Sequence, residues 1–217
     1  MGLQTLLCGD GPLASDLADR LTETGSDVSV VEPSGLLDRA EAAARVDAAV
    51  AGLGGLDLLV HVLSAPPTPT DLVDLDTDDW AAAAEAPMAV GLHLLQVARP
   101  HLANGSRVVH VLPTSAMGGA PGFAATATAA EGLRALNKSA ARQWGPAGIT
   151  TAVVAVAPEL ALGLLAATEG AALADAALGG PGGAGQLADL LEVLASPGAA
   201  FTTGSTIVAD GGTWMAP

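Results

Sequence analysis

Short apolar runs alternate along the chain with longer segments of helical periodicity. This alternation is typical of a parallel sheet that helices cover on both faces. The apolar runs predict six strands, at Leu3–Cys8, Asp27–Val31, Leu56–Leu63, Arg107–Leu112, Thr150–Ala155 and Ser205–Val208. The helical pattern predicts helices at Leu13–Glu23, Leu36–Leu53, Asp79–His101, Phe123–Trp144 and Gln186–Leu194. We therefore expect an α/β fold with one doubly wound parallel sheet flanked by helices.

The length of the chain fits one folded domain. Its 217 residues, of which 50% are hydrophobic, are enough to bury one core and too few for a comfortable second. No linker and no repeat of fixed period divides the sequence. We expect a single domain over residues 1–217.

Charge and cysteine content exclude several classes of partner. The net charge is -15, with eight Lys and Arg against 23 Asp and Glu, and Lys138 is the single lysine. Such a chain has no basic stripe with which to neutralise the phosphates of nucleic acid or of an anionic membrane. The single cysteine, Cys8, excludes an internal disulfide and suits a reducing compartment. Because the sequence shows neither a secretory leader nor an uninterrupted membrane-spanning run, we expect a cytoplasmic protein.

A glycine motif follows the first predicted strand. Gly9, Gly11 and Ala14 form a G-x-G-x-x-A pattern between a strand and a helix, as dinucleotide binding requires. Glycines there let the backbone approach a pyrophosphate that rests on the helix N-terminus. Glu32, at the end of the second strand, would accept hydrogen bonds from the adenosine ribose and repel a 2′-phosphate. These residues are the candidate cofactor site, and they would select NAD over NADP.

The same turn carries features that oppose a phosphate. Asp10 places a negative charge inside it, Pro12 removes a backbone donor, and no Lys or Arg precedes Arg20. A tight turn from strand to helix explains the glycines without any ligand. Two alternatives stay open, NAD(H) or no cofactor. No spacing of His, Cys, Asp and Glu resembles a metal site, so we expect no metal.

The rest of the chain resembles the short-chain dehydrogenase/reductase family. Two of the segments that carry the resemblance are strands: Gly54–Val60 leads into a central strand, and Arg107–Gly118 contains the strand that bears the family's serine. The other two are Leu133–Arg142 with Gly145–Ile149, the helix and turn after the active site, and Thr203–Gly212, the C-terminal strand and turn. The resemblance spans essentially the whole chain. It implies a Rossmann-like fold and an ancestry in NAD-dependent oxidation and reduction.

The family's proton donor is missing from this chain. Members use a tyrosine whose pKa is lowered by a lysine four residues on, and a serine hydroxyl that positions the reacting oxygen. The chain contains no tyrosine, and the resemblance, anchored on Leu133, places the tyrosine position at Thr126 and the lysine position at Ala130. An aliphatic hydroxyl is a far weaker acid than a phenol. The relay asparagine corresponds to Pro87, which leaves Ser115 alone of the catalytic set.

Segments that lie beside the cofactor in the family also differ here. His61–Ser64 stands where the family keeps Asn-Asn-Ala-Gly, and Pro158-Glu159 stands where it keeps Pro-Gly. Between Glu32 and Gly54 the chain is too short for the family's helix, third strand and helix. We therefore expect a shortened region around the third strand, with a truncated adenine side of the pocket.

His61 and His110 are the candidates for acid–base chemistry, since histidine titrates near neutrality. They lie at the ends of neighbouring predicted strands. In an open α/β sheet the carboxyl ends of strands form the ligand crevice, so His61, His110 and Ser115 are expected to meet at one site. A histidine satisfied within the core is the alternative interpretation at each position.

The elements with which family members pair subunits are better preserved in this sequence than the family's catalytic residues. Residues 79–101 and 123–144 and the C-terminal strand correspond to the elements with which family members pair subunits, and small apolar side chains on the helices permit close approach. The resemblance therefore implies a homo- or hetero-oligomer with subunits of the same family.

Three functions follow from this contrast. The leading hypothesis is a non-catalytic family member that assembles with an active relative in an oxidoreductase complex. The first alternative is an enzyme of changed, non-redox chemistry, a cyclase, dehydratase or lyase that uses His61, His110 or Ser115. The second is NAD-dependent hydride transfer with an unusual proton donor, because the hydride chemistry belongs to the cofactor. A ligand-sensing domain is the least specific interpretation.

Overall fold

Parallel strands form the centre of the molecule. The computed structural model describes residues 2–64, 68–162 and 175–215, and within these ranges the strands form one sheet in the order β2-β1-β3-β4-β5-β6. Their bounds are β1 Gln4–Cys8, β2 Asp27–Val31, β3 Leu58–Val62, β4 Arg107–Pro113, β5 Thr150–Val156 and β6 Thr206–Ala209. Every neighbouring pair is parallel. The predicted Rossmann-like sheet is therefore confirmed.

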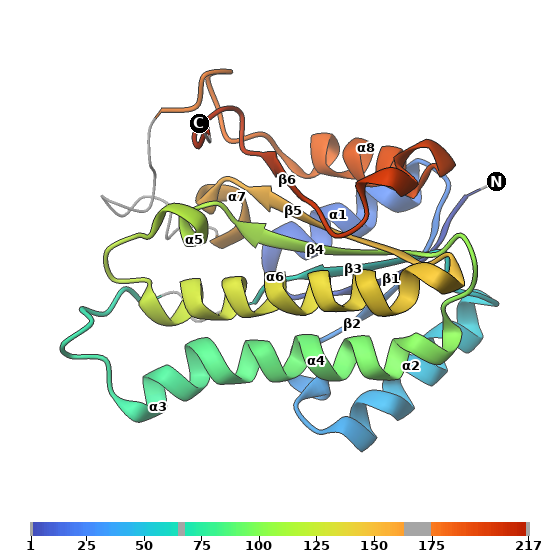
Figure 1. Cartoon of the computed structure of the whole chain (residues 1–217), viewed down its shortest axis with the longest axis horizontal. Coiled ribbons are helices and arrows are strands. Elements are labelled where there is room, and N and C mark those ends of the chain that lie inside the picture. The colour runs from blue at the N-terminus through green and yellow to red at the C-terminus, as the bar shows by residue number, and fades with distance from the viewer. Residues whose placement is uncertain (1, 65–67, 163–174, 216–217) are drawn as a thin grey trace.

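Helices cover both faces of the sheet (Figure 1). On one face lie α1 (Gly11–Glu23) and α8 (Ala184–Ala195), and on the other lie α2 (Arg39–Leu53), α4 (Ala86–Ala98) and α6 (Ala124–Trp144). Short helical segments complete the described chain: η1 Pro33–Leu36, α3 Thr77–Trp80, η2 Ala81–Glu85, η3 Arg99–His101, α5 Ser115–Gly118, η4 Gly145–Ala147, α7 Pro158–Leu162 and η6 Pro197–Thr202.

The region between β2 and β3 is short, as the sequence predicts. It holds η1 and α2 and no strand, so β2 is an edge of the sheet. The continuous helix expected from Leu36 is interrupted at Asp38, whose backbone is extended. Asp38 Oδ1 accepts hydrogen bonds from the amides of Ala40 and Glu41, both at 2.9 Å. An aspartate that caps a helix in this way begins a new one, which is why α2 starts at Arg39.

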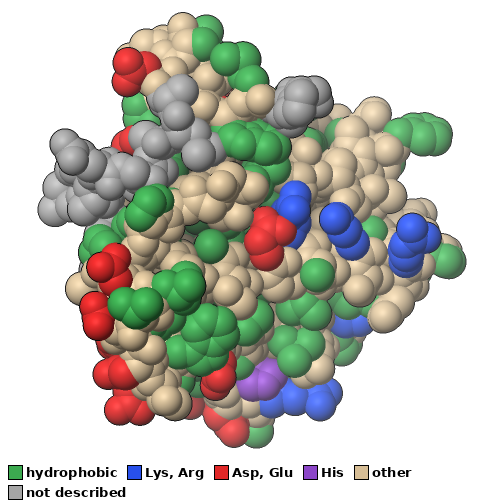
Figure 2. Space-filling view, turned by 60° about the vertical axis from the view of Figure 1, so that its left-hand side comes forward, with side chains coloured by type: hydrophobic (Ala, Val, Ile, Leu, Met, Phe, Trp, Pro, Cys, Tyr) green, Lys and Arg blue, Asp and Glu red, His purple; other side chains and the backbone are tan. Residues whose placement is uncertain are grey.

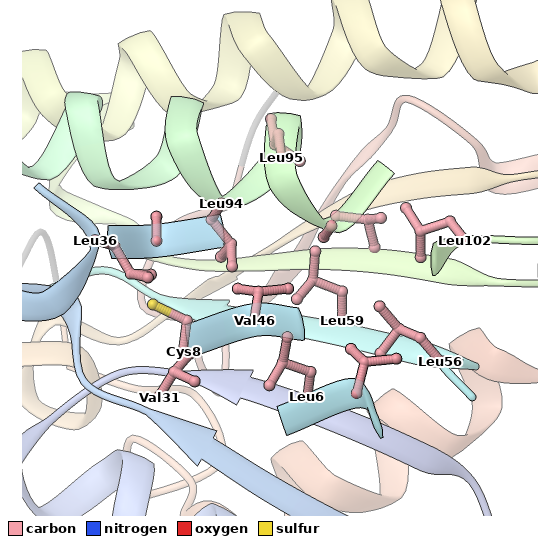
Figure 3. Close-up of a cluster of buried hydrophobic side chains, with 14 of the residues drawn as sticks. Leu6, Cys8, Val31, Leu36, Val46, Leu56, Leu59, Leu94, Leu95 and Leu102 are labelled. Atoms are coloured by element: carbon pink, nitrogen blue, oxygen red, sulfur yellow. The ribbon is translucent and has the colours of Figure 1, made fainter. Parts of the chain in front are cut away.

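The two central strands are buried on both faces. Every residue of β3 and of β4 is buried. Leu59 joins the cluster under α2 and α4, whereas Val60 joins the cluster under α1 and α8. Figure 3 shows the first cluster, with Leu59 of the sheet pointing toward Leu94 of α4. Cys8 lies in the same cluster, and burial raises the pKa of its thiol, as expected of an inert core cysteine.

The long helical segment before β4 contains a widened turn. It runs without a break from Thr77 to His101, and its π-helical part, η2, comes immediately before Pro87. Because proline has no N–H and its ring crowds the preceding turn, the helix widens there. By length and composition alone the segment could cross a membrane. Part of the segment packs against the sheet, where Val90, Leu94, Leu95 and Ala98 are buried in the core cluster.

One glycine sets how closely α4 approaches its neighbours. A Cβ built on Gly91 would overlap Cδ2 of Leu133 on α6 and lie 3.2 Å from Cε1 of His61 on β3. α4, α6 and β3 therefore meet at a point that has no room for a side chain.

We predict that Gly91→Val destabilises the protein. Overpacking of a filled core typically costs about 1–3 kcal/mol, and chemical denaturation measures this as a lower midpoint. The matched control is Gly52→Ala on α2, where a Cβ meets nothing within 4 Å. Alanine in that helix should leave the midpoint unchanged or raise it. Equal stability of Gly91→Val and the parent would contradict the packing described.

Candidate functional site

A pocket opens where the carboxyl ends of β1 and β3 lie side by side. These strands are neighbours in the sheet, and the chain leaves β1 toward α1 on one face and reaches α4 on the other after β3. Such a switch point is where open α/β sheets bind ligands. The pocket has a volume of about 400 Å³. We call it the switch-point pocket. The residues that line it are Asp10, Pro33, Ser34, Leu37, His61, Ser64, Ala82, Ala86, Pro87 and Val90.

A second pocket lies beside it, against α1. This α1 pocket has a volume of about 320 Å³ and shares Asp10 and Ser64 with the first. Its remaining lining residues are Gly11, Pro12, Leu13, Asp16, Leu63, Glu159, Leu160, Ala161 and Leu162. The two pockets together occupy the position that the glycine motif predicts for a dinucleotide.

The glycine motif has a packing explanation. A Cβ on Gly9 would lie 3.0 Å from the Cβ atoms of Ala14 and Val62, so glycine lets α1 approach β3. Gly11 has φ of +72°, a left-handed conformation that favours glycine, and it starts α1. Ala14 is buried. The three residues lie where the sequence places them, and close packing accounts for Gly9 and Ala14.

The charges around the motif oppose a pyrophosphate. Asp10, Asp16 and Glu159 line the α1 pocket, and Asp10 also lines the switch-point pocket. Among the described residues, no Lys or Arg lines either pocket. Pro12 leaves the first turn of α1 with one amide fewer. A dinucleotide would bring two negative phosphates among carboxylates with no cation to offset them.

Glu32, the predicted ribose ligand, is exposed at the N-cap position of η1, where its side chain makes no capping hydrogen bond, and it lines neither pocket. Together with the carboxylates at the glycine turn, this placement means that the residues present do not fit NAD(H). Three or more potential metal ligands do not gather anywhere in residues 2–64, 68–162 and 175–215 either.

The structure brings His61 and His110 together. They occupy paired positions on β3 and β4, and their Nδ1 atoms lie 3.0 Å apart. The rings meet edge to face, and both side chains are fully buried, with 1% and 0% exposure. Burial, with the neighbouring ring as a lesser cause for His61, lowers the pKa of His61 to about 3; burial lowers that of His110 to about 4. The pair is therefore neutral near pH 7.

The hydrogen bond between the rings fixes their tautomers. Only one Nδ1 carries the proton that the other accepts. Among the described residues, the buried polar atoms without a partner include Nε2 of His110 but not Nε2 of His61. Since an orphaned N–H is tolerated less than an orphaned acceptor, His110 donates from Nδ1 and keeps Nε2 bare. His61 then carries its proton on Nε2, and His61 is the member of the pair that lines the switch-point pocket.

The positions of the family's catalytic serine, tyrosine and lysine lie outside this pocket, whereas Pro87, at the position of the relay asparagine, lines it. Ser115 begins α5, is buried, and lines none of the described pockets. Thr126 and Ala130 lie on the buried side of α6. Thr126 lines a separate pocket of about 170 Å³ beside Phe123. Of the three residues expected to meet, the structure brings the two histidines into contact and places Ser115 elsewhere.

Sequence reasoning missed the far wall of the switch-point pocket. Ala82, Ala86 and Val90 come from η2 and α4, and Ser34 comes from η1. Positions 82, 86 and 90 are four residues apart, which places these three side chains on one face of the helical segment. That signal does not say which strand end the face covers.

Known proteins resemble this chain along most of its length. A protein-family model described as enoyl-(acyl carrier protein) reductase matches residues 7–213. Trans-4-hydroxycyclohexanecarboxylate dehydrogenase of Sinomonas cyclohexanicum is 28% identical over 192 residues, an alignment that covers 88% of this chain and 73% of that protein.

Solved structures resemble the whole described fold. A short-chain dehydrogenase from Burkholderia cenocepacia J2315, in complex with NADP, matches with a TM-score of 0.83 at 23% identity over 98% of both chains. A 3-ketoacyl-(acyl-carrier-protein) reductase from Brucella melitensis, complexed with NADH, matches with a TM-score of 0.78 at 18% identity, over 97% of this chain and 98% of that one. At these identities the likeness concerns the fold.

We predict that the histidine pair makes stability depend on pH between 7.5 and 5.5. The unfolded chain takes up protons on both histidines near pH 6.5, whereas the folded pair resists protonation down to about pH 4. Stability is therefore full above the unfolded pKa and falls as the pH drops, by about 1.4 kcal/mol per histidine over this range. Thermal unfolding of the parent and of the His61→Leu/His110→Leu variant measures the slope, which the double substitution should flatten.

The control for this experiment is His101→Gln. His101 is partly exposed and pairs with Asp47 at 2.7 Å. Its replacement should therefore leave the fall in stability between pH 7.5 and 5.5 unchanged. A parent protein whose stability does not change between pH 7.5 and 5.5 would contradict the buried pair.

Proposed function

The chain belongs to the short-chain dehydrogenase/reductase family, and from this premise we propose that it is a non-catalytic subunit that assembles with an active member of the family. The observation that carries the proposal is the absence of tyrosine from the whole chain. The positions that the resemblance assigns to the catalytic tyrosine and lysine hold Thr126 and Ala130, buried side chains without an acid or a cation.

The lining of the two pockets supports the same proposal. A working member of the family holds its dinucleotide beside the glycine turn, and here that turn is surrounded by Asp10, Asp16 and Glu159. These carboxylates oppose binding of the NAD(H) phosphates, so they also argue against hydride transfer by this chain. The fold of an oxidoreductase is kept while both its proton donor and its phosphate site are lost.

The outer face of α4 and α6 offers a surface for the partner. Composition predicts no basic stripe, yet Arg134, Lys138 and Arg142 recur at every fourth position and lie on one face of α6. Lys138 and Arg142 are exposed, and Arg134 pairs with Glu131 at 2.6 Å. Three of the eight basic residues of a strongly acidic chain thus form one short row on α6.

Acidic residues gather at the other end of this face. Around α3 and η2, before α4, lie Asp71, Asp74, Asp76, Asp78, Asp79 and Glu85. Figure 2 shows Lys and Arg side chains in a row, apart from the Asp and Glu side chains at the lower left. α4 and α6 run in the same direction (Figure 1), so the charges separate along the face. A related subunit that packs the same helices antiparallel would bring opposite charges together.

The edge at β6 offers a second surface. Phe201 on η6 is fully exposed, Val193 on α8 is 60% exposed, and Val208 on β6 is 37% exposed. Apolar side chains left in water beside an unpaired edge strand mark a contact site, because both lower their free energy when covered. We assign this edge to a further subunit contact.

A changed, non-redox chemistry is the second candidate function. The observation in its favour is that His61, a buried titratable side chain, lines the switch-point pocket and contacts a second histidine. If the pair acts on a substrate, the His61→Leu/His110→Leu variant loses turnover while its melting temperature at pH 7.5 stays close to that of the parent.

We predict that NADH produces no binding heat with the parent protein up to about 1 mM in isothermal titration. Because carboxylates cause the exclusion, the triple variant Asp10→Asn/Asp16→Asn/Glu159→Gln should bind NADH more tightly than the parent does. The matched control, Asp27→Asn/Asp189→Asn/Glu192→Gln, removes the same charge at positions that line neither pocket. Micromolar binding of NADH by the parent would overturn the exclusion.

We predict that the protein co-purifies with an active dehydrogenase from its own cells and that the basic row carries part of the contact. Lys138→Glu/Arg142→Glu should reduce the recovered dehydrogenase activity, and the loss should shrink in high salt. The control is Arg20→Glu/Arg39→Glu, which makes the same charge change on α1 and α2. A homo-oligomer with turnover of its own and no associated dehydrogenase would contradict the proposed function.

A further inference from the structure

The switch-point pocket keeps its volume although its residues do not suit a dinucleotide. A volume of about 400 Å³ is retained at the strand ends, within the size range of small-molecule sites. Small side chains hold it open: Ala82, Ala86 and Val90 present one face of the helical segment to it. The pocket therefore has the size of a small-molecule site and a lining that differs from that of a dinucleotide site.

Its polar groups are few and differ in kind. His61 lies at its buried side, held between His110 at 3.0 Å and the backbone of Gly91. With Nδ1 engaged by His110, the remaining donor of His61 is Nε2–H, on the side chain that lines the pocket. The hydroxyls of Ser34 and Ser64 also line the pocket, and Asp10 supplies its one formal charge.

The negative charge at the pocket favours ligands that carry a positive charge. Asp10 is the charged residue among those that line the pocket, and the protein carries a net charge of -15. The resulting potential concentrates cations at the pocket and repels anions. Pro33, Leu37 and Val90 provide apolar contact in the same pocket.

We propose that the switch-point pocket binds a small organic ammonium compound with an apolar body, whose ammonium group faces Asp10 and whose carbonyl, ether or hydroxyl oxygen accepts a hydrogen bond from His61 Nε2–H. Phosphate-bearing ligands are excluded by the carboxylates at the glycine turn. This inference goes beyond the proposed function, and its site is defined by described residues of this chain.

Three probes of equal size and different charge test the proposal. We choose 4-methoxybenzylamine, 4-methoxybenzyl alcohol and 4-methoxybenzoate, which share an ether acceptor and an aromatic ring and carry a positive, zero and negative charge at neutral pH. Each is titrated into protein labelled with ¹⁵N in its histidine rings, and the His61 signals are followed by NMR. The amine should bind at least about tenfold more tightly than the benzoate, with the alcohol between them.

Variants separate this site from other surfaces. Asp10→Asn should remove the advantage of the amine over the alcohol while leaving alcohol binding in place. Ala82→Trp should abolish binding of both, because the larger side chain occupies the pocket from an exposed helical position. Ala48→Trp, at an exposed position of α2 outside the pocket, is the matched control and should bind like the parent.

Three results would overturn the proposal. They are benzoate binding as tight as that of the amine, binding that survives Ala82→Trp, and no shift of the His61 signals by any probe up to about 10 mM. Circular dichroism of each variant establishes that a loss of binding is not a loss of fold. None of these outcomes depends on NADH or on co-purified dehydrogenase, so failure here is distinct from failure of the subunit proposal.

Discussion

The structure depends on the burial of β3 and β4 on both faces. Parallel strands enclosed in this way admit almost only apolar side chains, and a polar residue among them needs a partner inside the core. His61 and His110 occupy paired positions on these strands and bind each other at 3.0 Å. The same enclosure brings α4 close to the sheet through Gly91. The helix that seals the core is thereby also one wall of the switch-point pocket.

At this site the backbone elements keep the arrangement of a dinucleotide-binding fold, but the charges of the lining residues do not suit phosphates. The glycine turn, the neighbouring ends of β1 and β3 and the cavity beside them keep the positions that a dinucleotide-binding protein requires. Those positions depend on packing, since Gly9 is needed for the approach of α1 to β3. The charges do not depend on packing, and Asp10, Asp16 and Glu159 lie where phosphates would bind. The chain therefore keeps the family's architecture, while the charges at this site differ from those that a dinucleotide needs.

The sequence predicts the sheet well because apolar runs report burial directly. It also predicts the loss of a strand after β2, since the residues before β3 are too few to form one. It places His61 and His110 on neighbouring strands, but His110 occupies the middle of β4 and not its end. Local features that depend on single side chains were missed: the break at Asp38, where a carboxylate caps α2, and the widened turn before Pro87. The pocket wall from η2 and α4, the place of Ser115 outside it, and the basic row on α6 depend on tertiary packing or on helix phase. Composition and strand order do not contain that information.

As a structural partner of an active dehydrogenase, this chain should occur in one assembly with that enzyme. Native mass spectrometry of the protein purified from its own cells, with and without added NADH, tests it most directly because one spectrum gives both subunit composition and cofactor occupancy. The account predicts a mixed oligomer in which the number of bound NADH molecules equals the number of partner subunits. A homo-oligomer that carries one NADH per chain would contradict it and would show that this chain binds the cofactor despite Asp10, Asp16 and Glu159.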